Sequence, residues 1–149
     1  MKGMLKWPLI VAAIAVVLRV VVEQYGAPDA VANYISVVAL HLVIGPMYVA
    51  IRLATSGAPR PYGTLIKLVA LYVVLTRVMV LPTYWLARIY NWPQQRFGGL
   101  ADSSPLTGFI TIPFATAGRW IVASLVFGGI AGSIVIAIIR LLNRKPESA

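Results

Sequence analysis

The sequence predicts an all-α integral membrane protein in which a single domain, residues 1–149, forms a bundle of four transmembrane helices. Three observations carry this prediction. Hydrophobic residues make up 60% of the chain and charged residues only 11%, a balance unlike that of soluble globular domains. The mean hydropathy is +0.85. The apolar residues fall into four runs, each long enough to cross a hydrocarbon core of about 30 Å at about 1.5 Å per residue.

The first predicted helix covers residues 5–25 and the second covers residues 30–55. A cleaved signal peptide is the alternative for the first run, because a basic start precedes it and residues 30–32 mimic a cleavage site. The apolar run is, however, longer than the apolar region of a typical signal peptide. Gly45-Pro46 predicts a kink in the second helix, because proline lacks an N–H and crowds the carbonyl four residues earlier.

The third predicted helix covers residues 64–90 and contains Pro82, so we expect a second kink there. A long outer loop follows at residues 91–112 and is rich in Gly, Pro, Ser and Gln. Loops of this length are usually functional, disordered or folded back against the membrane. The fourth helix is predicted at residues 113–142, since proline suits the first turn of a helix.

Small residues recur at every fourth position of the fourth predicted helix. Ser124, Gly128 and Gly132 fall on one stripe, and Gly129 and Ser133 fall on the neighbouring stripe. Small side chains allow transmembrane helices to approach one another closely. The pattern therefore predicts close helix packing, either inside the bundle or against a partner helix.

The distribution of basic residues predicts the orientation. Cytoplasmic loops of membrane proteins carry an excess of lysine and arginine. With both termini in the cytoplasm, only Arg88 and Arg96 lie in outer loops. The residues placed inside are Lys2, Lys6, Arg52, Arg60, Lys67, Arg140, Arg144 and Lys145. We predict a multi-pass protein of the bacterial cytoplasmic (inner) membrane, surrounded by membrane lipids. The net charge of +9 does not indicate a nucleic-acid partner, because the basic residues separate apolar runs and form no polar face.

Ionisable residues inside the apolar runs are the strongest candidates for a functional site, since an arginine at the bilayer centre costs about 2.5 kcal/mol even on the mildest scale. Counting along the helices places His41 and Arg77 at a similar depth. No acid lies at that depth, so the expected partners of Arg77 are carbonyls freed by the two prolines, a hydroxyl of Thr76 or Tyr72, or an anionic ligand. Arg77 is either a buried structural clamp or a binding residue. His41 is either a hydrogen-bonded interior residue or part of the same site.

Four further residues complete the set of candidates. Arg19 and Glu23 lie four residues apart in the first helix and can form an ion pair near the outer interface, with either a structural or a binding role. Tyr48 and Tyr72 are included because an enzyme acting on a lipid or quinone would need hydroxyl groups beside His41 and Arg77.

The residue content excludes several kinds of chemistry. The chain has no cysteine and one histidine, which excludes disulfides, thiolate chemistry and any metal or haem site that needs several histidines from one chain. Paired carboxylates and a phosphate-binding glycine loop are also absent from the sequence. We expect no catalytic residues, no metal and no cofactor.

Three functions are compatible with these observations. The first is a non-enzymatic subunit or scaffold of a membrane complex, with other membrane-protein subunits or further copies of the chain as partners. The alternative is a carrier or channel for a small anionic or amphipathic solute that uses Arg77 and His41, and it requires an aqueous cavity that reaches Arg77. The third is a membrane enzyme that acts on a lipid or quinone.

Overall fold

The computed structural model describes residues 3–143, and within this range it is all-helical, with no strand. Four stretches are long and apolar enough to cross a membrane. They are Lys6–Gln24, Asp29–Thr55, Pro61–Tyr90 and Thr107–Leu142. The prediction of an all-helical chain with four membrane-length stretches is thereby confirmed. Three basic residues used in the orientation argument, Lys2, Arg144 and Lys145, lie outside the described residues.

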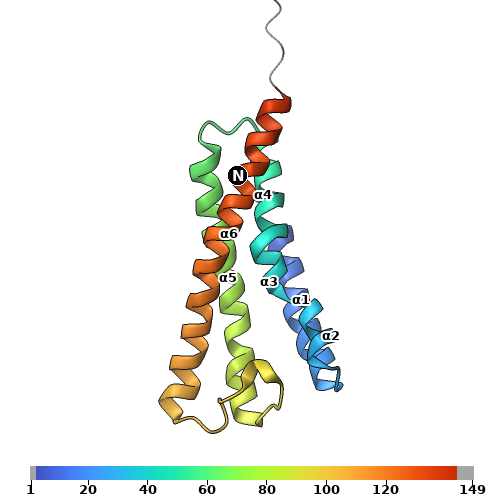
Figure 1. The fold of residues 1–149 in the computed structure, drawn as a ribbon, viewed down its shortest axis with the longest axis vertical. Helices are drawn as coiled ribbons and strands as arrows, with labels where there is room; N and C mark the ends of the chain where they lie inside the picture. Colours follow the sequence, from blue (N-terminus) through green and yellow to red (C-terminus); the bar gives the residue numbers. More distant parts are fainter. Residues whose placement is uncertain (1–2, 144–149) are drawn as a thin grey trace, which may run out of the picture.

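The stretches are built from shorter elements, which Figure 1 labels where there is room. In chain order they are α1 (Lys6–Gln24), α2 (Asp29–Tyr34), α3 (Val37–Ala39), the π-helix η1 (Leu40–Ile44), α4 (Gly45–Thr55), α5 (Pro61–Tyr90), the 3₁₀-helix η2 (Gln95–Phe97), the π-helix η3 (Thr107–Thr111) and α6 (Ile112–Leu142).

The second stretch is not the continuous helix that we predicted over residues 30–55. It breaks at Ile35 and Ser36, between α2 and α3. Ser36 has extended backbone angles (φ −115°, ψ 132°), and its hydroxyl accepts a hydrogen bond of 3.2 Å from the backbone N–H of Val38. This is N-capping, in which a serine hydroxyl satisfies an N–H at the start of a helix. The break lies about ten residues before the proline that the sequence analysis singled out.

Around Pro46 the backbone widens into the π-helix η1. The N–H of Gly45 donates to the carbonyl of Leu40, five residues earlier. A wider turn suits a following proline. It moves the preceding carbonyl groups away from the proline ring, which would otherwise clash with them and has no N–H to bond them. Pro46 then occupies the first turn of α4. The bend that we predicted at Gly45-Pro46 stays a prediction.

A π turn also precedes Pro113, and it lies inside the segment that we predicted as a loop. Helical backbone resumes at Pro105, and η3 continues directly into α6. The N–H of Ile112 donates to the carbonyl of Thr107 across the π turn. The outer connection is therefore shorter than the predicted 91–112. The helix begins before Pro113, the residue at which we predicted its start, because the π turn accommodates the proline inside the helix. In contrast, Pro82 lies inside the continuous helix α5, and a kink there also stays a prediction.

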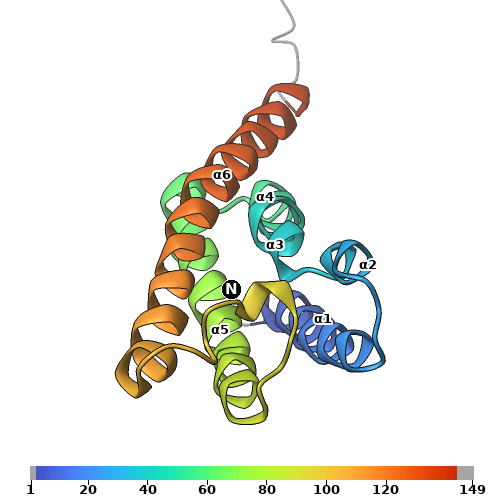
Figure 2. The same ribbon diagram turned by 60° about the horizontal axis from the view of Figure 1, so that its bottom comes forward.

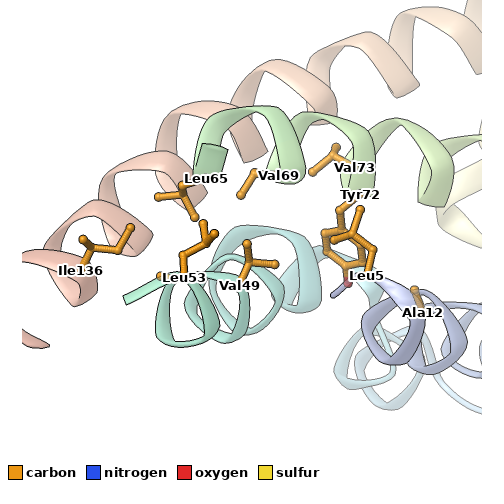
Figure 3. Packing of buried hydrophobic residues seen from close by; sticks show 10 residues of the cluster. Leu5, Ala12, Val49, Leu53, Leu65, Val69, Tyr72, Val73 and Ile136 are labelled. Carbon is orange, nitrogen blue, oxygen red and sulfur yellow. The ribbon is translucent and has the colours of Figure 1, made fainter. Parts of the chain in front are cut away.

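Two hydrophobic clusters hold the helices together. In Figures 1 and 2, α6 runs beside α5 and crosses α4, whereas α1 and α2 diverge from α6 toward the end that carries the connection between α5 and α6. The larger cluster joins α4, α5, α6 and the start of α1, and Figure 3 shows Leu53, Leu65, Tyr72 and Ile136 in it. The second cluster lies at the diverging end and includes Phe97 and Leu100 of the α5–α6 connection, both almost fully buried.

The small residues of α6 lie where the helices approach one another. A Cβ atom added to Gly128 would lie 2.6 Å from Cγ of Pro46, and one added to Gly132 would lie 2.8 Å from Cδ2 of Leu65. A Cβ on Gly129 would lie 3.0 Å from Cδ1 of Ile66. Whether the small-residue stripe drives helix association in a membrane is a prediction that these contacts do not test.

Candidate functional site

The centre of the candidate site is a hydrogen bond between Arg77 and His41. Nη2 of Arg77, on α5, lies 2.9 Å from Nδ1 of His41, in the π-helix η1. A guanidinium can only donate, so Nδ1 accepts and the single proton of the imidazole is on Nε2. His41 is therefore neutral in this arrangement and does not cancel the charge of Arg77.

Aromatic rings pack beside this pair. The Trp120 ring of α6 has its centroid 5.6 Å from Cζ of Arg77, within cation–π range. The Tyr72 ring meets the His41 ring edge-on at 5.6 Å. Arg77 is only 6% exposed, yet its Nε has no hydrogen-bond partner within residues 3–143, and neither does Nε2 of His41. The pair is therefore buried with part of its hydrogen-bonding capacity unused.

Within residues 3–143 the hydrogen-bond partner of Arg77 is His41, which was not among the protein groups that we predicted; an anionic ligand as a partner stays a prediction. The Thr76 hydroxyl donates to the carbonyl of Tyr72 at 2.7 Å, and His41 holds the guanidinium. The sequence contained the signal, because helix counting had already placed His41 and Arg77 at a similar depth. The rotation of the two helices, which brings the side chains face to face, could not be read from that count.

A second charged group surrounds Glu23. Its carboxylate accepts from Nε of Arg19 at 2.8 Å and from Nη2 of Arg96 at 2.6 Å. The Arg19–Glu23 pair has the predicted spacing of four residues. Arg96, in the α5–α6 connection, was missed because it lies 73 residues away in the chain. Arg19 also donates to the side chain of Asn33 at 2.9 Å, so this group links α1 and α2 to the connection.

Burial has a clear electrostatic effect on Arg96. Removal from water lowers the pKa of its guanidinium below the ordinary value, and the negative charge of Glu23 opposes that shift. The carboxylate of Glu23 is itself almost completely buried, with 1% of its side chain exposed. The two residues therefore depend on each other for charge compensation.

A cavity of about 630 Å³ brings these groups together. Arg19, Arg77 and Arg96 all line it, and they come from α1, α5 and the α5–α6 connection. Apolar side chains such as Val38 and Val43 form much of the remaining wall. No aspartate or glutamate of the described residues lines this cavity. An arginine-rich wall beside an apolar wall suits an anionic ligand.

The other candidate residues do not line the larger cavity. Tyr48 and Tyr72 line a separate apolar cavity of about 200 Å³ beside Trp7 and Ile44. His41 is fully buried and lines neither cavity, so it can act on a ligand only through Arg77. Glu23 likewise reaches the larger cavity only through the two arginines that it binds. Tyr72 therefore packs beside His41, but neither tyrosine lines the cavity of the three arginines.

The stripes of α6 also differ in their surroundings. Ser124 is fully buried, and its hydroxyl has no hydrogen-bond partner among the described residues. Gly129 and Ser133 line a shallow hollow of about 440 Å³ on the outer side of the bundle. Within residues 3–143 no group of three or more histidine, aspartate or glutamate side chains is placed to hold a metal ion.

In comparisons with known proteins, no family model, no curated protein and no solved structure matches this chain.

Proposed function

We propose that this chain is a four-span membrane protein that binds an anionic solute in the cavity beside Arg77, as the binding step of a carrier. One observation carries the proposal: Arg77 is almost fully buried in the middle of an apolar helix, and it borders a cavity that no acid lines. An arginine at such a depth is expensive and is commonly part of a substrate or ion pathway. An anion in the cavity would compensate its charge.

The alternative role for Arg77 is that of a structural clamp. A clamp is expected to have its donors satisfied by the protein, because an unsatisfied buried donor costs about 1–3 kcal/mol. Here the hydrogen-bond partner, His41, is neutral, and Nε of Arg77 has no partner within residues 3–143. The cation–π contact with Trp120 offsets only part of the cost. Both facts favour a binding role.

The proposal includes the orientation and the membrane. Among the described residues, Lys6, Arg52, Arg60 and Arg140 belong to one end of the bundle, which we place in the cytoplasm of a bacterial cell. The cavity then lies toward the outer half of the membrane. Because the chain has no cysteine, single cysteines can report sidedness directly.

We expect Asp102→Cys to react with a membrane-impermeant maleimide in intact cells. Ser56→Cys, in the α4–α5 connection, should react only after permeabilisation. Both positions are exposed, so their labelling depends on sidedness. The reverse labelling pattern would contradict the orientation.

Anion binding is tested by thermal unfolding of the purified protein. The probes are glycerol 3-phosphate, oleate and 1-oleoyl-lysophosphatidic acid, each added to the wild type, to Arg77→Leu and to Arg119→Leu. Arg119 is the matched control, because it is an exposed arginine of α6 that does not line the cavity. A ligand that binds only the folded state raises the unfolding temperature.

We expect at least one probe to raise the unfolding temperature of the wild type and of Arg119→Leu but not that of Arg77→Leu. If no probe shifts the wild type, or if Arg77→Leu responds as the wild type does, the anion-binding proposal is wrong.

A role as a subunit of a larger complex is the second candidate, and the hollow on α6 favours it. Gly129 and Ser133 line it together with Val126, Ile130 and Ile134, which are exposed. Such a face suits a second transmembrane helix, from another subunit or another copy of the chain. Purification after gentle extraction as a monodisperse monomer with no associated protein would contradict this candidate.

A further inference from the structure

The charge of the large cavity indicates what kind of anion it suits. Arg19, Arg77 and Arg96 line the cavity, and Glu23 binds two of them. Three arginines and one glutamate give a net charge of +2. His41 adds no charge, because its Nδ1 accepts from Arg77.

Other polar groups face the same region. Tyr84 lines the cavity. Asp29 is exposed and lies in a small neighbouring hollow with Arg19 and Arg96, so it offsets part of the positive charge of those two arginines. Arg77 does not line that hollow.

A phosphate monoester matches this charge better than a carboxylate does. It carries about −1.5 to −2 at neutral pH and offers three acceptor oxygens, whereas a carboxylate carries one charge on two oxygens. Guanidinium groups bind phosphate oxygens through short, charge-assisted hydrogen bonds. The cavity offers such groups from three segments of the chain, and Nε of Arg77 and Nε of Arg96 have no hydrogen-bond partner within residues 3–143.

The apolar wall of the cavity includes residues that are exposed on the surface of the bundle. Val43 lines it and is 46% exposed, although it belongs to a stretch that is apolar enough to cross a membrane. Ala39, one turn earlier, also lines the cavity and is exposed. In Figure 2, α5 and α6 lie beside each other on one side of the region, and α1 and α3 lie on the other. In a bilayer, the exposed side chains of Ala39 and Val43 would face lipid chains.

The volume sets the size of the ligand. About 630 Å³ lies within the range of about 300–1,000 Å³ that small-molecule sites occupy. The cavity is therefore suited to a headgroup and the first part of one hydrocarbon chain. The rest of such a chain would pass Val43 into the surrounding lipid.

On the basis of the anion-binding function proposed above, we infer that the ligand is a single-chain lipid with a phosphate monoester headgroup. It enters sideways from the outer half of the membrane. Its phosphate binds Arg19, Arg77 and Arg96, and its chain lies along the apolar wall beside Val38 and Val43. His41 is a positioning residue that holds Arg77 toward the headgroup.

The test compares four probes in phosphatidylcholine nanodiscs. They are 1-oleoyl-lysophosphatidic acid, glycerol 3-phosphate without the chain, oleate with a carboxylate in place of the phosphate, and monooleoylglycerol without the charge. The measurement is the unfolding temperature as a function of probe concentration. We expect lysophosphatidic acid to act at a concentration about tenfold or more below that of glycerol 3-phosphate, since even two buried methylene groups contribute that factor. It should also act at a lower concentration than oleate and monooleoylglycerol, because these probes lack the phosphate.

Two variants separate headgroup from chain. Arg77→Lys keeps a positive charge but loses the forked donors, so the shift with lysophosphatidic acid should shrink. Val43→Phe places a larger side chain at the exposed part of the apolar wall, so it should weaken the effect of lysophosphatidic acid and leave that of glycerol 3-phosphate unchanged. Val17→Phe is the control, because Val17 is 64% exposed on α1 and does not line the cavity. Val43 and Val17 are both exposed, so neither variant is expected to prevent folding.

Each outcome has a distinct meaning. Equal shifts from glycerol 3-phosphate and lysophosphatidic acid would overturn the lipid inference but leave anion binding intact. Equal shifts from oleate and lysophosphatidic acid would overturn the preference for phosphate. An equal shift from monooleoylglycerol, or no shift from any probe, would overturn this inference and the proposed function together.

Discussion

Replacing Gly128 by alanine tests the closest approach of α6 to α4. The added Cβ would lie 2.6 Å from Cγ of Pro46 and 3.2 Å from the carbonyl oxygen of His41, below the 3.4 Å at which ordinary van der Waals contact begins. Neither group can turn aside, because one belongs to a proline ring and the other to the backbone. The two helices must therefore move apart. Overpacking of this kind costs roughly 1–3 kcal/mol in the free energy of unfolding.

The assay is thermal unfolding in a mild detergent, with Gly118→Ala as the control on the same helix. No heavy atom lies within 4 Å of a Cβ added at Gly118, so alanine there should leave stability unchanged or raise it. We expect Gly128→Ala to unfold several degrees below both the wild type and the control. If the two alanine variants unfold at the same temperature, α6 does not approach Pro46 as described, and the position of His41 opposite Arg77 loses its support.

Three further predictions concern the contacts around the site. Glu23→Gln should lower the free energy of unfolding by roughly 1–3 kcal/mol, because a neutral amide cannot compensate the charges of two arginines that are only partly exposed. Asp102→Asn, at an exposed position of the α5–α6 connection, is the control. Equal unfolding temperatures of the two variants would contradict the buried ion pairs. Gly45→Ala should lower the unfolding temperature, because its Cβ would meet the Tyr72 ring and lie 2.9 Å from the carbonyl oxygen of Leu40. Gly63→Ala is the control, because no heavy atom lies within 4 Å of a Cβ added there. An unchanged unfolding temperature of Gly45→Ala would argue against the packing of this segment on α5. Arg88→Gln should speed cleavage of the α5–α6 connection by chymotrypsin, because Arg88 donates hydrogen bonds to the carbonyls of Leu100, Ala101 and Ser103. Arg119→Gln is the control. Equal cleavage rates of the two variants would show that Arg88 does not hold the connection in place.

Part of the candidate site could be predicted because it depends on local spacing or on depth. Arg19 and Glu23 are four residues apart on one helix, so their ion pair follows from helix geometry. The depths of His41 and Arg77 follow from the rise of a helix. The pairing of Arg77 with His41 does not follow, because it requires a particular rotation of each helix. The π turn that contains His41 changes that rotation.

Arg96 shows the same limit at longer range. Its bond to Glu23 joins residues 73 positions apart, and it forms only because the α5–α6 connection folds back beside α1. The sequence predicts a long outer loop here, because the segment is rich in Gly, Pro, Ser and Gln. Burial of Phe97 and Leu100 holds part of it in place, and that packing depends on which helix ends lie together.

The sequence by itself determined the composition of the chain and its four apolar helical stretches, because hydropathy and chain length report these directly. It also determined that a positive charge must lie within the third stretch. Only the tertiary structure decided that Arg19, Arg77 and Arg96 line one cavity, and that Tyr48 and Tyr72 line another. The physical reason is that a cavity is formed by the crossing and rotation of helices, and these depend on contacts between residues far apart in the chain.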